Sequence, residues 1–146
     1  MKIGFGSDPN ATEFKQALMA KAAELGHETV DFGADDPIYA NVAVEVGQSA
    51  VAGEIDRGVV VCGTGIGVSI AANKVKGAHC ACVTDVYQAQ RATLSNSANM
   101  IAMGAQVVGI ETAKVLLEEY LANVFDENSR SAPKVQRIRE FESSGC

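Results

Sequence analysis

The stretch Gly58-Val59-Val60-Val61-Cys62-Gly63-Thr64-Gly65-Ile66-Gly67 decides the fold, because it joins a continuous apolar run to a glycine-rich turn. The run at 58–62 is typical of a strand buried on both faces, as in a parallel sheet. The pattern of the following residues, 68–74, predicts a helix. A buried strand that passes through a glycine loop into a helix begins a βα unit, so we expect further units on either side.

Strand-like and helical segments alternate along the rest of the chain. Short apolar runs predict four more strands, at 2–7, 27–32, 78–83 and 100–103. Apolar residues at helical spacing predict helices at 10–25, 39–52, 85–94 and 112–123, and Asn10 and Asp85 are the expected N-caps of the first and third of these. The alternation predicts an α/β fold, a Rossmann-like three-layer αβα sandwich with a five-stranded parallel sheet.

We assign residues 1–125 to this domain and residues 126–146 to a polar, basic tail that ends in a short helix after Pro133. The chain has 146 residues, which suits one domain, and a net charge of −6. The acidic balance argues against nucleic acid and anionic membrane surfaces as partners, since both require a basic face. A small anionic substrate is not excluded, because a pocket can be locally positive.

Location follows from what the sequence lacks. No apolar run is long enough to span a bilayer, and the residues after Met1 do not resemble a signal peptide. The four cysteines include no CxxC pair. We therefore expect a cytoplasmic protein with reduced thiols and no metal site.

Cys62 is the residue of the glycine loop that can carry chemistry. One interpretation is a buried apolar side chain at the end of a core strand, which is a common place for cysteine. The other is a thiol beside free loop amides and a helix N-terminus, which favour its thiolate form. A thiolate there suits proton abstraction next to a carbonyl, with the amides holding the enediolate oxygen. The loop lacks Rossmann spacing and a Walker Lys-Ser/Thr pair, which disfavours a nucleotide site.

Other polar residues also fall at strand ends. Asp8 and Thr84-Asp85 follow predicted strands, at the edge where open α/β sheets bind ligands. Asn96 and Asn99 precede a strand, so they need a different explanation. For Arg91 two interpretations have equal weight, an intersubunit contact and an exposed charge on a helix. We interpret the remaining candidates, at strand starts or in strands, as structural or core: His27, His79, Cys80 and Cys82.

The run 62–67, followed by Ser69-Ile70-Ala71-Ala72-Asn73-Lys74, resembles the type B ribose-5-phosphate isomerase and galactose-6-phosphate isomerase family. The resemblance covers nearly the whole chain and includes Gly6-Ser7-Asp8, Asp31-Phe32-Gly33, Ser97-Ala98-Asn99 and the segment 104–109. It implies aldose–ketose isomerisation of a phosphorylated sugar through an enediol, without a cofactor. It also implies homodimers or tetramers whose active sites are shared between subunits.

Residue roles follow from the same resemblance, position by position. Cys62 matches the catalytic base that moves a proton between C1 and C2, and Asp8 matches an aspartate that contacts sugar hydroxyls. Thr64 and the loop residues match the enediolate site, namely Gly63, Gly65, Ile66 and Gly67. Tyr39, Asn96 and Asn99 match substrate-binding positions. Arg130 and Lys134 match a phosphate grip that the tail brings from a neighbouring subunit, and Arg137 is a further candidate for it.

Four residues depart from the family pattern. Pro9 and Ser95 replace histidines, and Gln106 and Lys134 replace arginines. The histidine absent at Ser95 is the one assigned to opening the sugar ring, and serine cannot carry a proton near neutral pH as imidazole can. We therefore expect a substrate that needs no ring opening, such as erythrose or erythrulose 4-phosphate, in which the ring-closing hydroxyl is esterified.

Three alternatives stay open. A second, different chain can supply the histidine, as in the heteromeric galactose-6-phosphate isomerases. The chain can instead turn over the open-chain fraction of a pentose phosphate slowly. It can also be a non-catalytic sugar-phosphate-binding module, although the retained Cys62 and Thr64 favour the enzyme, because a pure binder does not need a thiol base.

Overall fold

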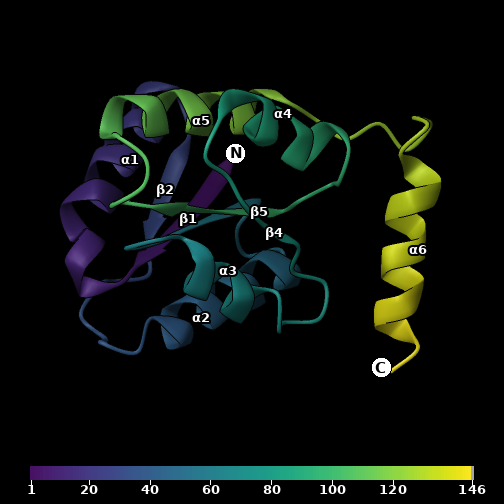
Figure 1. Ribbon diagram of the computed structural model, residues 1–146, viewed down its shortest axis with the longest axis horizontal. Helices are drawn as coiled ribbons and strands as arrows, with labels where there is room; N and C mark the ends of the chain where they lie inside the picture. Colours follow the sequence, from purple (N-terminus) through teal and green to yellow (C-terminus); the bar gives the residue numbers. More distant parts are fainter. Residues whose placement is uncertain (146) are drawn as a thin grey trace.

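The computed structural model describes residues 1–145, so the last residue of the predicted tail, Cys146, lies outside the described part of the chain. Five parallel strands form one sheet in the order β2-β1-β3-β5-β4 (Figure 1). Their bounds are β1 Lys2–Ser7, β2 Glu28–Asp31, β3 Arg57–Cys62, β4 Cys80–Cys82 and β5 Met100–Gly104. The predicted five-stranded parallel α/β fold is confirmed.

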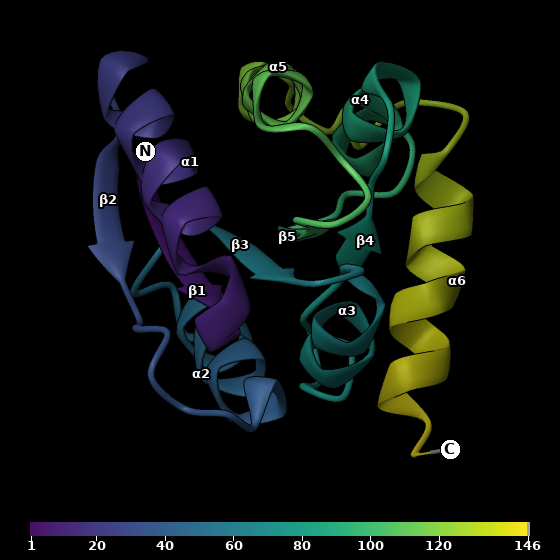
Figure 2. The same ribbon diagram turned by 60° about the vertical axis from the view of Figure 1, so that its left-hand side comes forward.

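Helices cover both faces of the sheet, as the figures show (Figures 1 and 2). One layer contains α1 (Thr12–Glu24), α4 (Val86–Leu94) and α5 (Ile110–Ala122), and the other contains α2 (Tyr39–Ala52) and α3 (Ile66–Ala72). Alternate residues of β3 serve the two cores: Val59 and Val61 pack under the first layer, and Val60 and Cys62 under the second. The residues of β3 after Arg57 are all apolar because neither face of the strand meets water there.

The sheet has its topological switch point between β1 and β3. The chain leaves β1 towards β2 on one side and then crosses to β3 on the other. The segments after these two strands therefore diverge and leave a crevice, which is where open α/β sheets bind ligands. Asp8 follows β1 and Cys62 ends β3, and the Asp8 N–H donates to the carbonyl oxygen of Val61 at 2.9 Å.

The first helical segment starts differently from the prediction. Asn10 is not the cap: Oδ1 of Asp8 accepts a hydrogen bond from the Asn10 N–H at 2.8 Å and caps a short 3-10 turn, η1 (Pro9–Ala11), before α1 begins. Pro9 explains the difference, since its fixed φ suits the first position of a helical turn. The predicted Asp85 cap is confirmed, because its carboxylate accepts from the Gln88 N–H at 2.9 Å.

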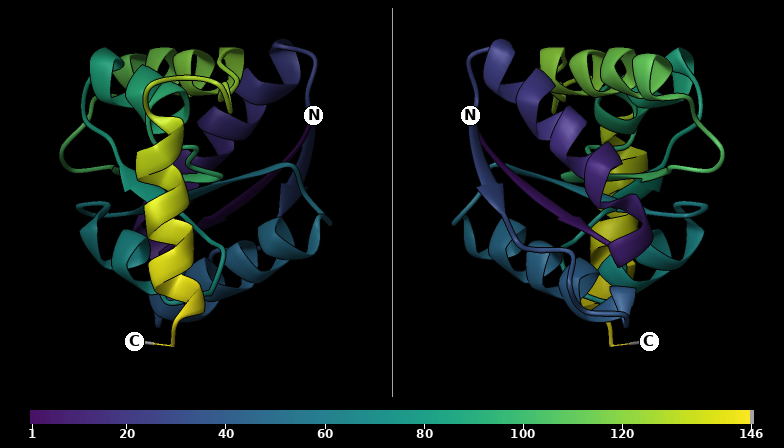
Figure 3. Two further views of the ribbon diagram at one scale, coloured as in Figure 1. Left: turned by 90° about the vertical axis from the view of Figure 1, so that its right-hand side faces the viewer. Right: turned by 90° about the vertical axis from the view of Figure 1, so that its left-hand side faces the viewer.

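The tail forms α6 (Ala132–Ser143), which stands at the β4 edge of the sheet and crosses from one helix layer to the other (Figure 3). Val135 is its one buried residue, and Glu142 accepts a hydrogen bond from the Gly77 N–H at 2.8 Å. Ile138 and Phe141 are more than half exposed. Within residues 1–145, none of the helices is long and apolar enough to cross a membrane.

Candidate active site

The carboxyl ends of β1 and β3 border a cavity of about 200 Å³ that we call the thiol pocket. The glycine loop forms one wall, the start of α2 another, and the segment after β5 a third. The residues lining it are Asp8, Asn10, Tyr39, Cys62, Gly63, Thr64, Gly67 and Gln106. The structure thus brings together six of the predicted site residues, which come from the segments after β1 and β3 and from the first turns of α2 and α3. They are Asp8, Tyr39, Cys62, Gly63, Thr64 and Gly67.

Cys62 is only 5% exposed, yet its side chain lines this pocket. Its Sγ accepts a hydrogen bond from the Gly65 N–H at 3.2 Å. Gly65 has φ +79°, and a Cβ there would lie 2.8 Å from the carbonyl carbon of Met103. Only glycine therefore allows the loop to turn this N–H onto the sulfur.

Thr64 and Tyr39 complete the wall around the sulfur. The Ile66 N–H donates to Thr64 Oγ1 at 3.3 Å, which fixes the threonine hydroxyl at the loop. Tyr39 lies over Gly67 so closely that a Cβ at that residue would be 2.5 Å from the phenol oxygen. The aromatic ring thus closes the pocket above α3, where a larger residue would expel it.

Asp8 and Gln106 bring the remaining polar groups. One carboxylate oxygen of Asp8 is the η1 cap described above, so the side chain both shapes the backbone and faces the pocket. The Gln106 carboxamide lies against Gly63, and the backbone N–H of Gln106 donates to the Gly63 carbonyl at 2.9 Å. The thiol pocket therefore contains a thiol, a carboxylate, two hydroxyls and two carboxamides, but no basic side chain.

Basic side chains gather in a second cavity, of about 240 Å³, lined by residues of α4 and α6 and of the turn before α6. Figure 2 shows where these two helices lie in the fold. We call this cavity the basic groove. Its lining residues are Tyr87, Arg91, Ser95, Asn96, Arg130, Ser131, Lys134, Val135 and Ile138. No residue lines both this groove and the thiol pocket. Arg130 and Lys134 thus lie together as predicted, with Ser95 and Asn96, but away from Cys62 of their own chain.

Arg137 does not line the groove. Its side chain is 71% exposed and lies 3.7 Å from Glu140 on the same helix. Arg139 is also turned away, with Nη2 3.2 Å from Ser97 Oγ and 3.4 Å from Glu127. Neither guanidinium shares a cavity with Arg130, so the role predicted for Arg137 gains no support from this arrangement.

The two predicted asparagines hold backbone in place. Asn99 accepts a hydrogen bond from the His79 N–H at 2.8 Å and donates to the Gly77 carbonyl at 2.9 Å. Asn96 donates to the Arg91 carbonyl at 2.9 Å. Asn99 precedes β5, whereas Cys62 pairs with Gly104 at the other end of that strand. Asn99 and Cys62 of the same chain therefore lie at opposite ends of β5, separated by the length of that strand.

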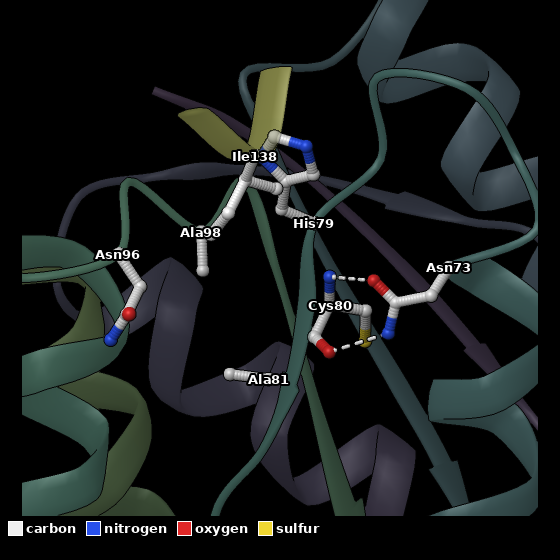
Figure 4. A pocket seen from close by; sticks show the side chains of 7 residues that line it. All are labelled: Asn73, His79, Cys80, Ala81, Asn96, Ala98 and Ile138. Atoms are coloured by element: carbon white, nitrogen blue, oxygen red, sulfur yellow. Dashed lines mark hydrogen bonds between the residues drawn. The ribbon is translucent and has the colours of Figure 1, made fainter. Parts of the chain in front are cut away.

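A third cavity, of about 210 Å³, lies between β4 and α6 and is lined by Ile138, His79 and Asn96 among others (Figure 4). The Asn73 side chain donates to the Cys80 carbonyl and accepts from the Cys80 N–H, both at 2.8 Å. It thereby pairs the backbone groups that β4, as an edge strand, leaves without a neighbouring strand. His79 Nε2 lies 3.7 Å from Glu142 of α6. Through these contacts α6 packs against the β4 edge of the sheet, which agrees with the structural role expected of His79.

The other two described cysteines differ in exposure. Cys80 is buried as expected, and burial raises the pKa of its thiol to about 12. Cys82 is exposed, so the prediction that it belongs to the core is wrong. The reason is its place at the end of a three-residue edge strand. Partial burial, and then the neighbouring Cys62, raise the pKa of Cys82.

A thiol and a carboxylate line one cavity at the carboxyl edge of this αβα sandwich, and both are groups that can move protons. The family model described as Ribose/Galactose Isomerase matches residues 3–138. The chain belongs to this ribose/galactose isomerase family, and it is a sugar-phosphate aldose–ketose isomerase.

Individual relatives match over nearly the full chain. D-erythrulose-4-phosphate isomerase 2 of Mycolicibacterium smegmatis is 41% identical, covering 99% of each protein. D-erythrulose-4-phosphate isomerase of Pectobacterium atrosepticum is 39% identical, covering 97% of this chain and 95% of that protein. The solved ribose-5-phosphate isomerase B of Clostridium thermocellum superposes with a TM-score of 0.93 at 37% identity, covering 100% of both chains.

Sequence reasoning missed two groups at these cavities. Gln106 was noted only as a lost arginine, although its place just after β5, beside β3, signals the same sheet edge as Cys62. Arg91 has no comparable signal. It joins Arg130 only because α6 packs beside α4, and a tail after position 125 does not specify where it will pack.

Proposed function

We propose that this isomerase interconverts D-erythrose 4-phosphate and D-erythrulose 4-phosphate, with Cys62 as the base. The observation that carries the proposal is the Cys62 sulfur at the wall of the thiol pocket, held by the Gly65 N–H at 3.2 Å. Two relatives that are 41% and 39% identical carry names with this substrate, which supports the same chain length here.

The reaction needs one carbon-bound proton to move between adjacent carbons. The Cys62 thiolate takes the proton from C2 of the aldose, and the electron pair moves to form the enediolate. The Thr64 hydroxyl and loop N–H groups stabilise the developing charge on oxygen. Asp8 exchanges hydroxyl protons between O1 and O2, and the Cys62 thiol returns its proton to C1. Such a base requires a reduced thiol, in keeping with the cytoplasmic location expected from the sequence.

Ser95 in the basic groove fits a linear substrate. In a tetrose 4-phosphate the oxygen that would close a five-membered ring carries the phosphoryl group, so the sugar is open before it binds. No group is then needed to protonate a ring oxygen. A serine hydroxyl, which does not titrate near neutral pH, is sufficient at this place.

We propose further that each active site is shared by two copies of the chain in a homodimer, or in a tetramer of such pairs. The thiol pocket has no cation for a phosphate dianion, and the basic groove has no base. A second copy that presents its groove to the thiol pocket supplies what each lacks. Two aromatic or aliphatic side chains that line the groove, Tyr87 and Ile138, are more than half exposed, which suits burial against a partner.

The test compares turnover of D-erythrose 4-phosphate, D-erythrulose 4-phosphate and ribose 5-phosphate by the purified single chain, followed by NMR in D₂O. We expect both tetroses to interconvert with deuterium incorporation and ribose 5-phosphate to react more slowly. Faster reaction of ribose 5-phosphate would contradict the substrate assignment. A need for a second, different chain would contradict the homomeric site.

Cys62→Ala separates an enzyme from a binding module. We expect turnover to fall at least about 10³-fold, because no other base replaces the thiol, while substrate still binds. The matched control is Cys82→Ala, which removes a neighbouring exposed thiol and leaves turnover unchanged. Equal activity of wild type and Cys62→Ala would rule out the thiol mechanism.

A further inference from the structure

The basic groove holds a third cationic side chain with no assigned role. Arg91 projects from α4 into the cavity that Arg130 and Lys134 also line. None of the residues that line this groove is acidic, although the chain as a whole has a net charge of −6. Three positive charges therefore converge on one cavity without a carboxylate to balance them.

Neutral neighbours hold Arg91 in place. Its guanidinium carbon lies 5.3 Å from the ring centroid of Tyr87, and Nη1 lies 3.5 Å from Ser95 Oγ. Its buried Nε has no hydrogen-bond partner among residues 1–145. By contrast, Arg137 and Arg139 on α6 each lie within 4.0 Å of a glutamate. None of the ion pairs among residues 1–145 involves Arg91, so a phosphate that enters the groove would give its guanidinium the counter-ion it lacks.

We infer that Arg91 binds the substrate's phosphate together with Arg130 and Lys134. The inference rests on the proposed function and adds a residue to it. The two terminal nitrogens of a guanidinium form a two-pronged face that matches two phosphate oxygens. Ser95 then has a positive role in this chain, because its small side chain leaves room for Arg91 and its hydroxyl contacts the guanidinium.

The test uses Arg91→Gln and Arg91→Lys in the full-length protein. We measure KM and kcat for D-erythrose 4-phosphate and the inhibition constant of inorganic phosphate. For Arg91→Gln we expect both constants to rise about 10- to 100-fold with kcat nearly unchanged, because a charge-assisted contact present in ground and transition states is lost. For Arg91→Lys we expect both constants to lie between those of wild type and of Arg91→Gln, since lysine keeps the charge and loses the two-pronged geometry.

Lys114→Gln on α5 is the control, because it removes one positive charge far from the groove. We expect it to leave both constants unchanged. The inference is overturned if Arg91→Gln has wild-type constants. It is also overturned if the variant lowers kcat and the melting temperature without weakening inorganic phosphate, since Arg91 would then act only on packing.

The proposed function can fail separately. If the wild-type protein isomerises no tetrose phosphate, calorimetric titration with inorganic phosphate still decides the role of Arg91. Weaker phosphate binding by Arg91→Gln than by wild type supports the inference, and equal binding overturns it.

Discussion

At the scale of single residues, position 95 lies in the groove that we propose for the substrate's phosphate. Ser95 lies one turn after Arg91 and contacts its guanidinium, so a hydroxyl and a permanent cation share this corner of the groove. A histidine there would bring a group that titrates near neutral pH. If the proposed roles hold, the histidine-to-serine exchange at this position removes a group for proton transfer and leaves room for a phosphate-binding arginine.

Ser95→His tests that exchange. We expect the ratio of kcat/KM for ribose 5-phosphate to that for D-erythrose 4-phosphate to rise about tenfold or more, because imidazole can protonate a ring oxygen. The ring-opening gain should depend on pH around the ordinary histidine pKa of ~6.5. Ser95→Asn, which is polar but does not titrate, should give no gain. An unchanged ratio for Ser95→His would contradict the ring-opening argument.

Gly65→Ala tests the loop that holds the sulfur. The residue has φ +79°, and the added Cβ would meet the backbone of Met103 at 2.8 Å, so the loop must move and withdraw its N–H from Cys62. We expect kcat to fall about 10²-fold and stability to fall by about 1–3 kcal/mol. Gly109→Ala is the control, since nothing lies within 4 Å of its Cβ. Wild-type kcat in Gly65→Ala would show that this hydrogen bond is dispensable.

At the scale of elements, an ion pair between a buried lysine and an exposed aspartate links α1 to β2. Lys15 on α1 is 1% exposed and binds Asp31 at the end of β2. Burial alone would raise the Asp31 pKa, but hydrogen bonds from Lys15, Gly33 and Gln16 together hold it below its usual range. The folded protein therefore binds a proton at Asp31 less readily than the unfolded chain does.

This pair makes stability depend on pH in a defined direction. Because the folded pKa of Asp31 is lowered, its contribution is present above the unfolded value of ~3.9 and is lost as pH falls through the folded value. Asp31→Asn should unfold more easily at pH 7 by about 2 kcal/mol, since it leaves Lys15 buried without a counter-ion. Urea titrations from pH 2 to pH 7 should show a flatter acid limb for the variant. Glu111→Gln, which breaks an exposed pair with Lys114, should change little.

Elements differ in how well their bounds could be predicted. The bounds predicted for β1 and α2 are those observed, because buried apolar runs and helical spacing specify them locally. The first helical segment begins with the η1 turn instead, because Pro9 suits the first position of a helical turn and Asp8 caps it. The strand expected at 78–83 shrinks to Cys80–Cys82, since an edge strand pairs on one side only.

At the scale of the whole molecule, the thiol pocket and the basic groove also differ in how well the sequence predicts them. The thiol pocket follows from the rule that polar residues after parallel strands meet at one edge, and the sequence alone indicated Asp8, Cys62 and Thr64. The basic groove depends on where α6 packs against α4, and no local pattern specifies that contact. Neither the thiol pocket nor the basic groove specifies the orientation in which two copies of the chain would associate.

Subunit mixing tests whether a working site takes one half from each copy. Cys62→Ala retains the basic groove, and the double variant Arg130→Gln/Lys134→Gln retains the thiol pocket, so each homodimer should be nearly inactive. In a mixed dimer, the intact pocket of one chain meets the intact groove of the other, while the second site carries both defects. After random exchange, half of the dimers are mixed and each has one working site, so activity should recover to about a quarter of wild type.

The measurement is turnover of D-erythrose 4-phosphate after mild dissociation and reassociation, with each variant treated alone as the control. If each chain instead completed its own site, mixing would restore no activity, because no chain in the mixture would carry both intact halves.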